Sequence, residues 1–230
     1  MRTSKNLDML SVVARGLQDL KDQVVFVGGA TVDLYVTDPG GEPLRPTDDV
    51  DCVIGITSRV AYRTLEEKLR ALKFSHPLDE ARPPICRWKF SGISVDVMPT
   101  DEGVLGFSNR WYPDGIAHAE SRVLPDGQTV AIFSLPYFLA SKIEAFLGRG
   151  KDDFYGSSDL EDIVTLIDRA EDLREKVLAA PKDVQNYIGE KFGSFLGNDL
   201  FVQSVAGHLD AGAGPGRVER VLGLMRELAK

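Results

Sequence analysis

The spacing of apolar positions changes near residue 134, and this change separates a strand-rich part of the chain from a helical part. Short apolar or alternating runs, which are typical of strands, occupy residues 24–27, 49–56, 85–90 and 93–98. The last two runs flank Ser91-Gly92, and a two-residue turn containing Gly predicts a hairpin. A second hairpin is predicted around Pro125-Asp126-Gly127. We therefore expect residues 20–133 to contain a sheet.

Apolar residues at helical spacing predict the remaining elements. In the N-terminal segment these residues are Leu7, Leu10, Leu17 and Leu20. One helix is predicted over residues 30–36, and another after Thr57 or Ser58, either of which can cap it. Further helices are predicted to begin at Ser134, Ser158, Pro181 and Arg217. Pro181 itself opens the third of these helices, and residues 158–161 have the pattern of a capping box. Segments rich in Gly and Pro predict loops at residues 37–47 and 211–216.

These elements predict an α/β (α+β) fold in two parts. Residues 1–133 are expected to form a domain with a mixed β-sheet and flanking helices, and residues 134–230 a helical domain. A chain of 230 residues buries enough surface to fold without a disulfide or a structural metal. Its 43% of hydrophobic and 27% of charged residues exclude a disordered or fibrous protein.

Charge and cysteine content narrow the function classes. Lys and Arg number 27 against 35 Asp and Glu, so the net charge of −8 argues against an overall electrostatic grip on nucleic acid. A local basic patch is still available at Arg59, Arg63 and Arg70. Cys52 and Cys86 have no metal-binding spacing, which favours a reducing compartment. Because no apolar stretch reaches the roughly 18 residues of a membrane span, we expect a cytoplasmic protein without membrane partners.

Gly28-Gly29 lies where the first predicted strand meets the following helix. Glycine has no Cβ, so a ligand can approach the backbone closely. The free N–H groups at the start of a helix favour a phosphate. The alternative is a tight turn that needs a positive φ.

Asp49 and Asp51 are two residues apart in a predicted strand, so their carboxylates point to one face. Two such charges about 4 Å apart repel by about 4 kcal/mol at an effective dielectric of about 20. Either a cation lies between them or this face is solvated. Asp96, in a later strand, supplies a third carboxylate. Carboxylate oxygens suit Mg²⁺, and two ions about 3.5–4 Å apart can assist phosphoryl transfer.

Taken together, Gly28-Gly29, the run Arg45-x-Thr47-x-Asp49-x-Asp51 and the later Asp96 resemble the signature of the DNA polymerase β superfamily of nucleotidyltransferases. More narrowly, GGATVDLY followed by RPTDDVD resembles the AbiEii/AbiGii-type enzymes of bacterial toxin–antitoxin and phage-defence systems. The resemblance extends over residues 25–165. Many superfamily members have Gly-Ser at the first motif, whereas this chain has Gly-Gly, as AbiEii-like members do.

The helical half contributes a second set of candidates. Lys142 and Arg149 are seven residues apart, so they share a helix face and are either a solvated cationic face or a triphosphate clamp. The resemblance implies that a downstream acidic motif belongs with them. Asp159 and Asp162 match that motif, but Ser158 stands where the family has a basic residue. Acidic residues in the first turn of a helix also simply complement its dipole.

The resemblance implies an enzyme that uses Mg²⁺ (or Mn²⁺) to move an NMP from an NTP to an acceptor hydroxyl. Asp49, Asp51 and Asp96 would be its catalytic and metal-binding residues. Nucleotide binding would involve Gly28, Gly29, Arg45, Thr47, Lys142, Arg149, Asp159 and Asp162. The acceptor would be a tRNA 3′ end or a protein, and a cognate antitoxin is a possible partner. Two alternatives stay open: a small-molecule, aminoglycoside-like nucleotidyltransferase, and a non-catalytic module that binds a nucleotide or a partner.

Overall fold

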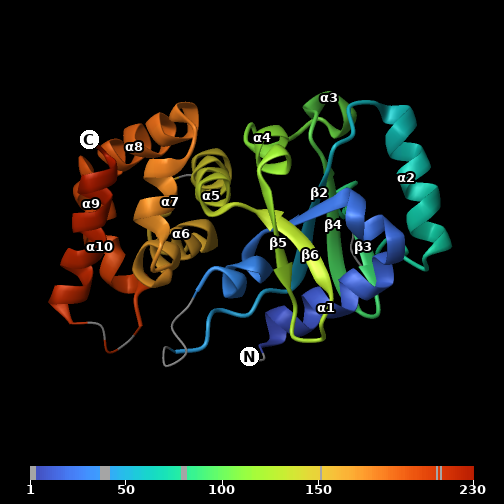
Figure 1. Cartoon of the computed structure of the whole chain (residues 1–230), viewed down its shortest axis with the longest axis horizontal. Helices are drawn as coiled ribbons and strands as arrows, with labels where there is room; N and C mark the ends of the chain where they lie inside the picture. The colour runs from blue at the N-terminus through green and yellow to red at the C-terminus, as the bar shows by residue number, and fades with distance from the viewer. Residues whose placement is uncertain (1–3, 37–41, 79–81, 151, 211, 213) are drawn as a thin grey trace. The chain divides into compact units, whose positions relative to one another are not determined.

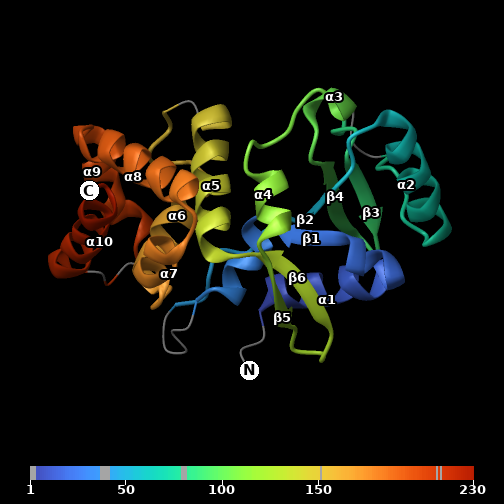
Figure 2. The same ribbon diagram turned by 45° about the horizontal axis from the view of Figure 1, so that its top comes forward.

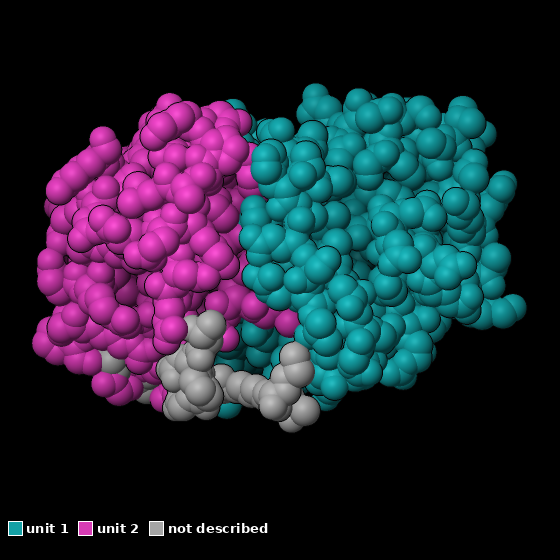
Figure 3. All heavy atoms as spheres, in the orientation of Figure 1, with its two compact units in different colours: residues 1–33, 43–134 teal, residues 34–42, 135–230 magenta. Residues whose placement is uncertain are grey.

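The computed structural model describes residues 4–36, 42–78, 82–150, 152–210, 212 and 214–230. Parts of the two predicted loops, 37–41 and residues 211 and 213, lie outside this range. The chain divides into two compact units (Figure 3). Residues 1–33 and 43–134 form the first, and residues 34–42 and 135–230 form the second.

The first unit is built on a six-stranded mixed sheet with the strand order β3-β4-β2-β1-β6-β5 (Figure 2). The strands are β1 Val24–Val27, β2 Asp49–Ile54, β3 Arg87–Phe90, β4 Ile93–Pro99, β5 Ala119–Val123 and β6 Thr129–Phe133. Parallel pairing joins β1 to β6 and β2 to β4, and the other neighbours are antiparallel. Both predicted hairpins, β3-β4 and β5-β6, are confirmed.

Helices around the sheet are mostly short (Figure 1). They are α1 Lys5–Leu17, α2 Arg59–Ala71, α3 Glu102–Leu105, α4 Tyr112–Ala117 and the 3₁₀ helices η1 Gln18–Gln23 and η2 Gly29–Leu34. Ser58 caps α2, since its side chain accepts from the backbone N–H of Ala61. The helix predicted over residues 30–36 is wrong in type and length, because the chain there forms the single 3₁₀ helix η2.

The two faces of the sheet at β2, β3 and β4 differ in chemistry. One face carries apolar side chains that are almost fully buried: Val50, Cys52, Trp88, Val95 and Val97. Helix α1 packs against this face, where Gly16 leaves room for the ring of Phe90; a Cβ on Gly16 would lie 2.3 Å from that ring. The opposite face carries the acidic residues of β2 and β4, so the helix packing leaves the polar face for chemistry.

The second unit is helical. Its helices are α5 Leu135–Arg149, α6 Ser158–Arg169, α7 Leu173–Ala179, α8 Lys182–Leu196, α9 Asp199–Ser204, η3 Val205–His208 and α10 Pro215–Leu228. The cap of α6 is Ser157, which accepts from the N–H of Leu160, so the predicted cap at Ser158 is wrong by one residue. Among the described residues, no helix has the length and apolar character that crossing a membrane requires.

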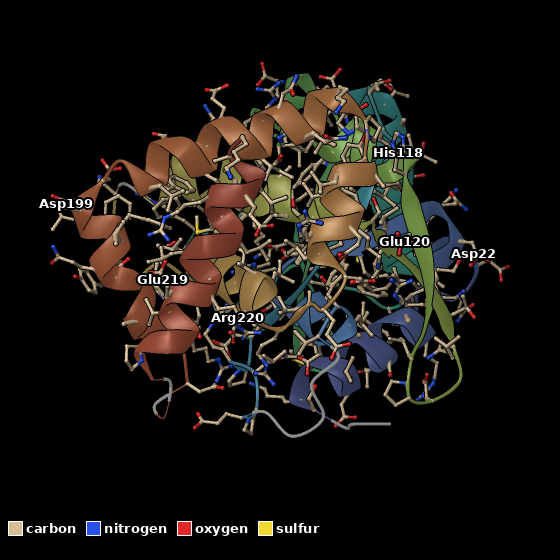
Figure 4. The ribbon with its side chains drawn as sticks, turned by 60° about the vertical axis from the view of Figure 1, so that its left-hand side comes forward. Asp22, His118, Glu120, Asp199, Glu219 and Arg220 are labelled. Carbon is tan, nitrogen blue, oxygen red and sulfur yellow. The ribbon has the colours of Figure 1, made fainter. Side chains whose placement is uncertain are left out.

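In the second unit, side chains that are far apart in the sequence contact one another. Tyr35 stacks on Phe138 of α5 with ring centroids 4.6 Å apart. Arg169, at the end of α6, donates to the carbonyl of Glu42. The buried carboxylate of Asp168 accepts from Arg217 and Arg220, which connects α6 to α10, where Figure 4 labels Arg220. Tyr35 and Glu42 therefore contact helices that follow them by about a hundred positions or more.

Candidate functional site

Three carboxylates meet on the polar face of the sheet in the first unit. Asp49 and Asp51 come from β2, and Asp96 comes from β4. Because β2 and β4 pair in parallel with Asp51 beside Asp96, the side chains of this pair point the same way. One oxygen atom from each of the three carboxylates lies within 4.8 Å of the others. We call Asp49, Asp51 and Asp96 the carboxylate triad.

An arginine that the sequence analysis did not single out completes this cluster. The guanidinium of Arg87 donates to both oxygens of Asp96, at 2.8 and 2.7 Å. It also donates to Asp49 at 3.2 Å. Arg87 is on β3, directly opposite Asp96 in the antiparallel register. The signal was available: counting outward from the Ser91-Gly92 turn pairs Phe90 with Ile93 and, three pairs on, Arg87 with Asp96.

The charges of the triad affect its neighbours on the buried face. Burial raises the pKa of the Cys52 thiol well above its ordinary value, and the negative charges of Asp51 and Asp96 raise it further. Burial also raises the pKa of Cys86 to about 12, with the same two carboxylates adding to the effect. Both thiols are free and buried, as packing residues are. The site therefore concentrates negative charge beside an apolar layer.

Gly28 touches the triad directly. Its φ is +76°, and a Cβ added there would lie only 1.9 Å from Oδ2 of Asp51. The carbonyl of Gly28 accepts from the N–H and the hydroxyl of Thr31, which closes the turn into η2. The predicted positive φ is therefore present, together with close approach of backbone to a carboxylate. Since η2 begins at Gly29 and has only six residues, its helix dipole is small.

The residues that precede the triad along the chain are held by a buried asparagine. Asn6 of α1 donates to the carbonyl of Arg45 and accepts from the N–H of Thr47. The same side-chain nitrogen donates to Asp33, at 2.9 Å. The hydroxyl of Thr47 donates to the carbonyl of Asp49, at 3.0 Å. Thr47 thus acts through the backbone to set the position of Asp49.

The other four predicted nucleotide-binding residues contact one another within the second unit. Lys142 lies on α5 with only 6% of its surface exposed, so the solvated-face interpretation is wrong for it. Its ammonium contacts Asp159 at 3.1 Å and Asp162 at 2.7 Å. Arg149 also pairs with Asp159, at 2.7 Å, although 72% of its side chain is exposed.

This cluster lowers the pKa of one of its members, Asp159. Burial favours the neutral form of Asp159, but the hydrogen bond from Arg149 and the charge of Lys142 outweigh burial. Together they hold the pKa of Asp159 below its ordinary value. The carboxylate is therefore charged at neutral pH despite being buried.

The residues of the triad fit a divalent cation. All three donors are carboxylate oxygens, which are the ligands that Mg²⁺ and Mn²⁺ prefer. A positive group, the Arg87 guanidinium, already binds two of the three carboxylates. The donor set of the cluster is therefore compatible with a divalent cation between β2 and β4.

Comparison with known proteins gives a limited result. The chain matches no protein-family description and no curated protein. Among solved structures it is similar to a "putative nucleotidyltransferase" from H. pylori, with 11% sequence identity and a TM-score of 0.47. The match covers 99% of this chain and 96% of that one.

Proposed function

We propose that the protein is a metal-dependent nucleotidyltransferase that moves an NMP from an NTP to an acceptor hydroxyl. The observation that carries the proposal is the carboxylate triad: three acidic side chains from two parallel strands, with oxygens within 4.8 Å of one another. The order of Gly28-Gly29, Arg45-x-Thr47-x-Asp49-x-Asp51 and Asp96, which resembles that of polymerase β-type enzymes, supports the same reading.

In this proposal the triad holds one or two Mg²⁺ or Mn²⁺ ions, which neutralise charge on the phosphates and activate the attacking oxygen. The acceptor hydroxyl loses its proton to Asp96 as its oxygen forms a bond to the α-phosphorus. The bond from the α-phosphorus to the bridging oxygen breaks, and pyrophosphate leaves. The contribution of the protein is positioning and electrostatics.

The nucleotide is proposed to lie along the Gly28-Gly29 turn, where a side chain would block approach to Asp51. Arg45 and Thr47 belong to the segment that sets Asp49, so their proposed part is to hold the site in shape. Within the second unit, taken by itself, Arg149 is proposed as a phosphate-binding cation, since most of its side chain is exposed. Asp159 is proposed to hold Arg149 in position through their ion pair, and Lys142 and Asp162 to complete the charge cluster around Asp159.

The acceptor proposed first is a tRNA 3′ end or a protein side chain, in the cytoplasm, as for AbiEii-type toxins with a cognate antitoxin. A cationic small molecule is the second candidate. The net charge of −8 favours it, because an acidic protein attracts a cationic acceptor more readily than a polyanion.

The test is to incubate the protein with Mg²⁺ or Mn²⁺ and each α-labelled NTP in turn, with total tRNA, with an aminoglycoside, or alone. We expect label on the RNA or on the protein itself, and none with Asp49→Asn or Asp51→Asn. Label on the aminoglycoside alone would favour the small-molecule enzyme. If NTPs bind without any transfer, the chain is a non-catalytic module. Undiminished transfer by either variant would contradict the assignment of the triad.

A further inference from the structure

We propose that Arg87 is the built-in counter-cation of the carboxylate triad, which a divalent cation must displace, and that the displaced guanidinium then binds a phosphate of the nucleotide. The inference rests on the proposed function and adds a residue outside its motifs. In the structure, Arg87 binds both oxygens of Asp96 and one oxygen of Asp49. It thus connects a carboxylate of β4 with one of β2.

Arg87 and a divalent cation compete for the same atoms. The guanidinium uses both oxygens of Asp96, so a cation bound to this carboxylate must take at least one of them. Both groups are positive, and like charges within about 4 Å of one another repel strongly in a partly buried site. Asp96 itself is mostly buried, and a buried carboxylate needs a positive partner. Arg87 supplies this partner whenever the cation is absent.

The position of Arg87 allows its side chain to leave without disturbing the fold. Strand β3 is at one edge of the sheet, and the guanidinium lies at the end of a long side chain that is 23% exposed. The backbone of Arg87 stays fixed, because it pairs with Asp96 in the β-ladder and its carbonyl lies 3.2 Å from Nδ1 of His76. A phosphate is the natural next partner, since the planar fork of a guanidinium binds phosphate oxygens in pairs.

The first measurement is the affinity for Mn²⁺ alone, by titration calorimetry, in the wild type, Arg87→Gln and Arg87→Lys. We expect Arg87→Gln to bind Mn²⁺ about tenfold more tightly or better, because the competing charge is gone. Arg87→Lys should bind Mn²⁺ with an affinity between the two. The matched control is Arg122→Gln on β5, the opposite edge strand, where Arg122 pairs with Glu120 at 2.7 Å. Figure 4 labels Glu120 on this strand. This control should leave the affinity unchanged.

The second measurement is the affinity for each NTP at saturating Mn²⁺. The substitution that strengthens Mn²⁺ binding is expected to weaken nucleotide binding. Arg87→Gln should bind nucleotide at least about tenfold more weakly than the wild type, since a charged hydrogen bond is lost. If Arg87 had a purely structural role, Arg87→Gln would weaken the affinity for Mn²⁺ and the affinity for NTP together. Arg87→Lys, which keeps the positive charge, is the control for loss of the fold in Arg87→Gln.

The outcomes separate this inference from the proposed function. Equal or weaker Mn²⁺ binding by a folded Arg87→Gln variant overturns the counter-cation role, while NMP transfer by the wild type would leave the enzyme assignment standing. Tighter Mn²⁺ binding without transfer of any NMP supports Arg87 and contradicts the enzyme assignment. If no variant binds Mn²⁺, both fail. An unchanged NTP affinity overturns the phosphate step.

Discussion

Single residues in this protein acquire their role from the two-residue period of a strand. Asp49, Asp51 and Asp96 could be identified from the sequence because alternation with apolar residues is visible there. Arg87 has the same kind of signal, but it becomes informative only after the hairpin register is counted out. Burial of Lys142 had no such signal. Its partners follow 17 or more residues later on another helix, and a Lys on a helix is ordinarily solvated.

Gly28 offers a test of how closely the chain passes the triad. Gly28→Ala should destabilise the protein by about 1 kcal/mol for the positive φ, and by more for the contact with Asp51. Gly127→Ala is the matched control, because Gly127 also has a positive φ of +87° but open space around its Cβ. Chemical unfolding in urea measures both. Equal losses of unfolding free energy in the two variants would contradict the close approach at Gly28.

Elements were predictable where they are long enough to show their own period, which is two residues in a strand and about 3.6 in a helix. The strands and the longer helices have enough residues to display a period, and the structure has them close to the predicted bounds. The short helices α3, α4 and α9 have four to six residues, less than two turns, so no period is visible. At η2 the β-branched Thr31 and Val32 disfavour an α-helix, and a 3₁₀ helix is found where a longer one was expected.

The connection between α1 and the segment before β2 gives a second prediction. Asn6→Ala should lower the unfolding free energy by about 1–3 kcal/mol, because it removes the side-chain partner of the partly buried Arg45 carbonyl and of the buried Thr47 N–H. Since this segment sets Asp49, NMP transfer should fall more than the stability loss explains. Ser11→Ala is the control: Ser11 is buried on the same helix but donates only to Leu7 within it. If Asn6→Ala and Ser11→Ala behave alike in urea unfolding and transfer assays, the hydrogen bonds from Asn6 to Arg45 and Thr47 do not position the site.

Helices α5 and α6 are joined by the charges around Lys142. Lys142→Met should destabilise the protein by about 3–5 kcal/mol, since it removes a positive charge that two buried carboxylates contact. Lys191→Met is a control at an exposed ion pair with Glu190, where about 0–1 kcal/mol is expected. Thermal and urea unfolding measure both variants. A loss at Lys142 as small as at Lys191 would contradict a stabilising role for its ion pairs with Asp159 and Asp162.

At the scale of the whole molecule, the spacing of apolar positions indicated an α/β part followed by a helical part, and the mixed architecture is confirmed. The sequence did not indicate that residues 34–42 group with the helices that follow residue 134. Tyr35 meets Phe138, and Glu42 meets Arg169, through contacts between positions about a hundred or more residues apart. Such contacts depend on tertiary packing, for which a local hydrophobic pattern carries no signal.

Acid stability of the whole chain should depend on Arg149. The pKa of Asp159 is depressed in the fold, against an unfolded value near 3.9. A depressed carboxyl pKa contributes stability that is fully present above the unfolded pKa and lost as pH falls through the folded one. Arg149→Gln removes the largest favourable contribution to this shift, so it should lower the unfolding free energy by a constant amount from pH 7 to about pH 5.

As pH falls below the unfolded pKa of about 3.9, the difference between the two proteins should shrink, and it should vanish once the pH lies below the folded pKa of Asp159, where this carboxyl group is protonated in both. Urea unfolding at pH 7, 5, 4 and 3 would measure the difference, and other titrating groups cancel between variant and wild type. Arg226→Gln, at an exposed pair with Glu219, is the control and should give a small difference throughout. A difference for Arg149→Gln that does not shrink at all between pH 5 and pH 3 would show that Arg149 stabilises the helical unit by packing and not by holding the charge of Asp159.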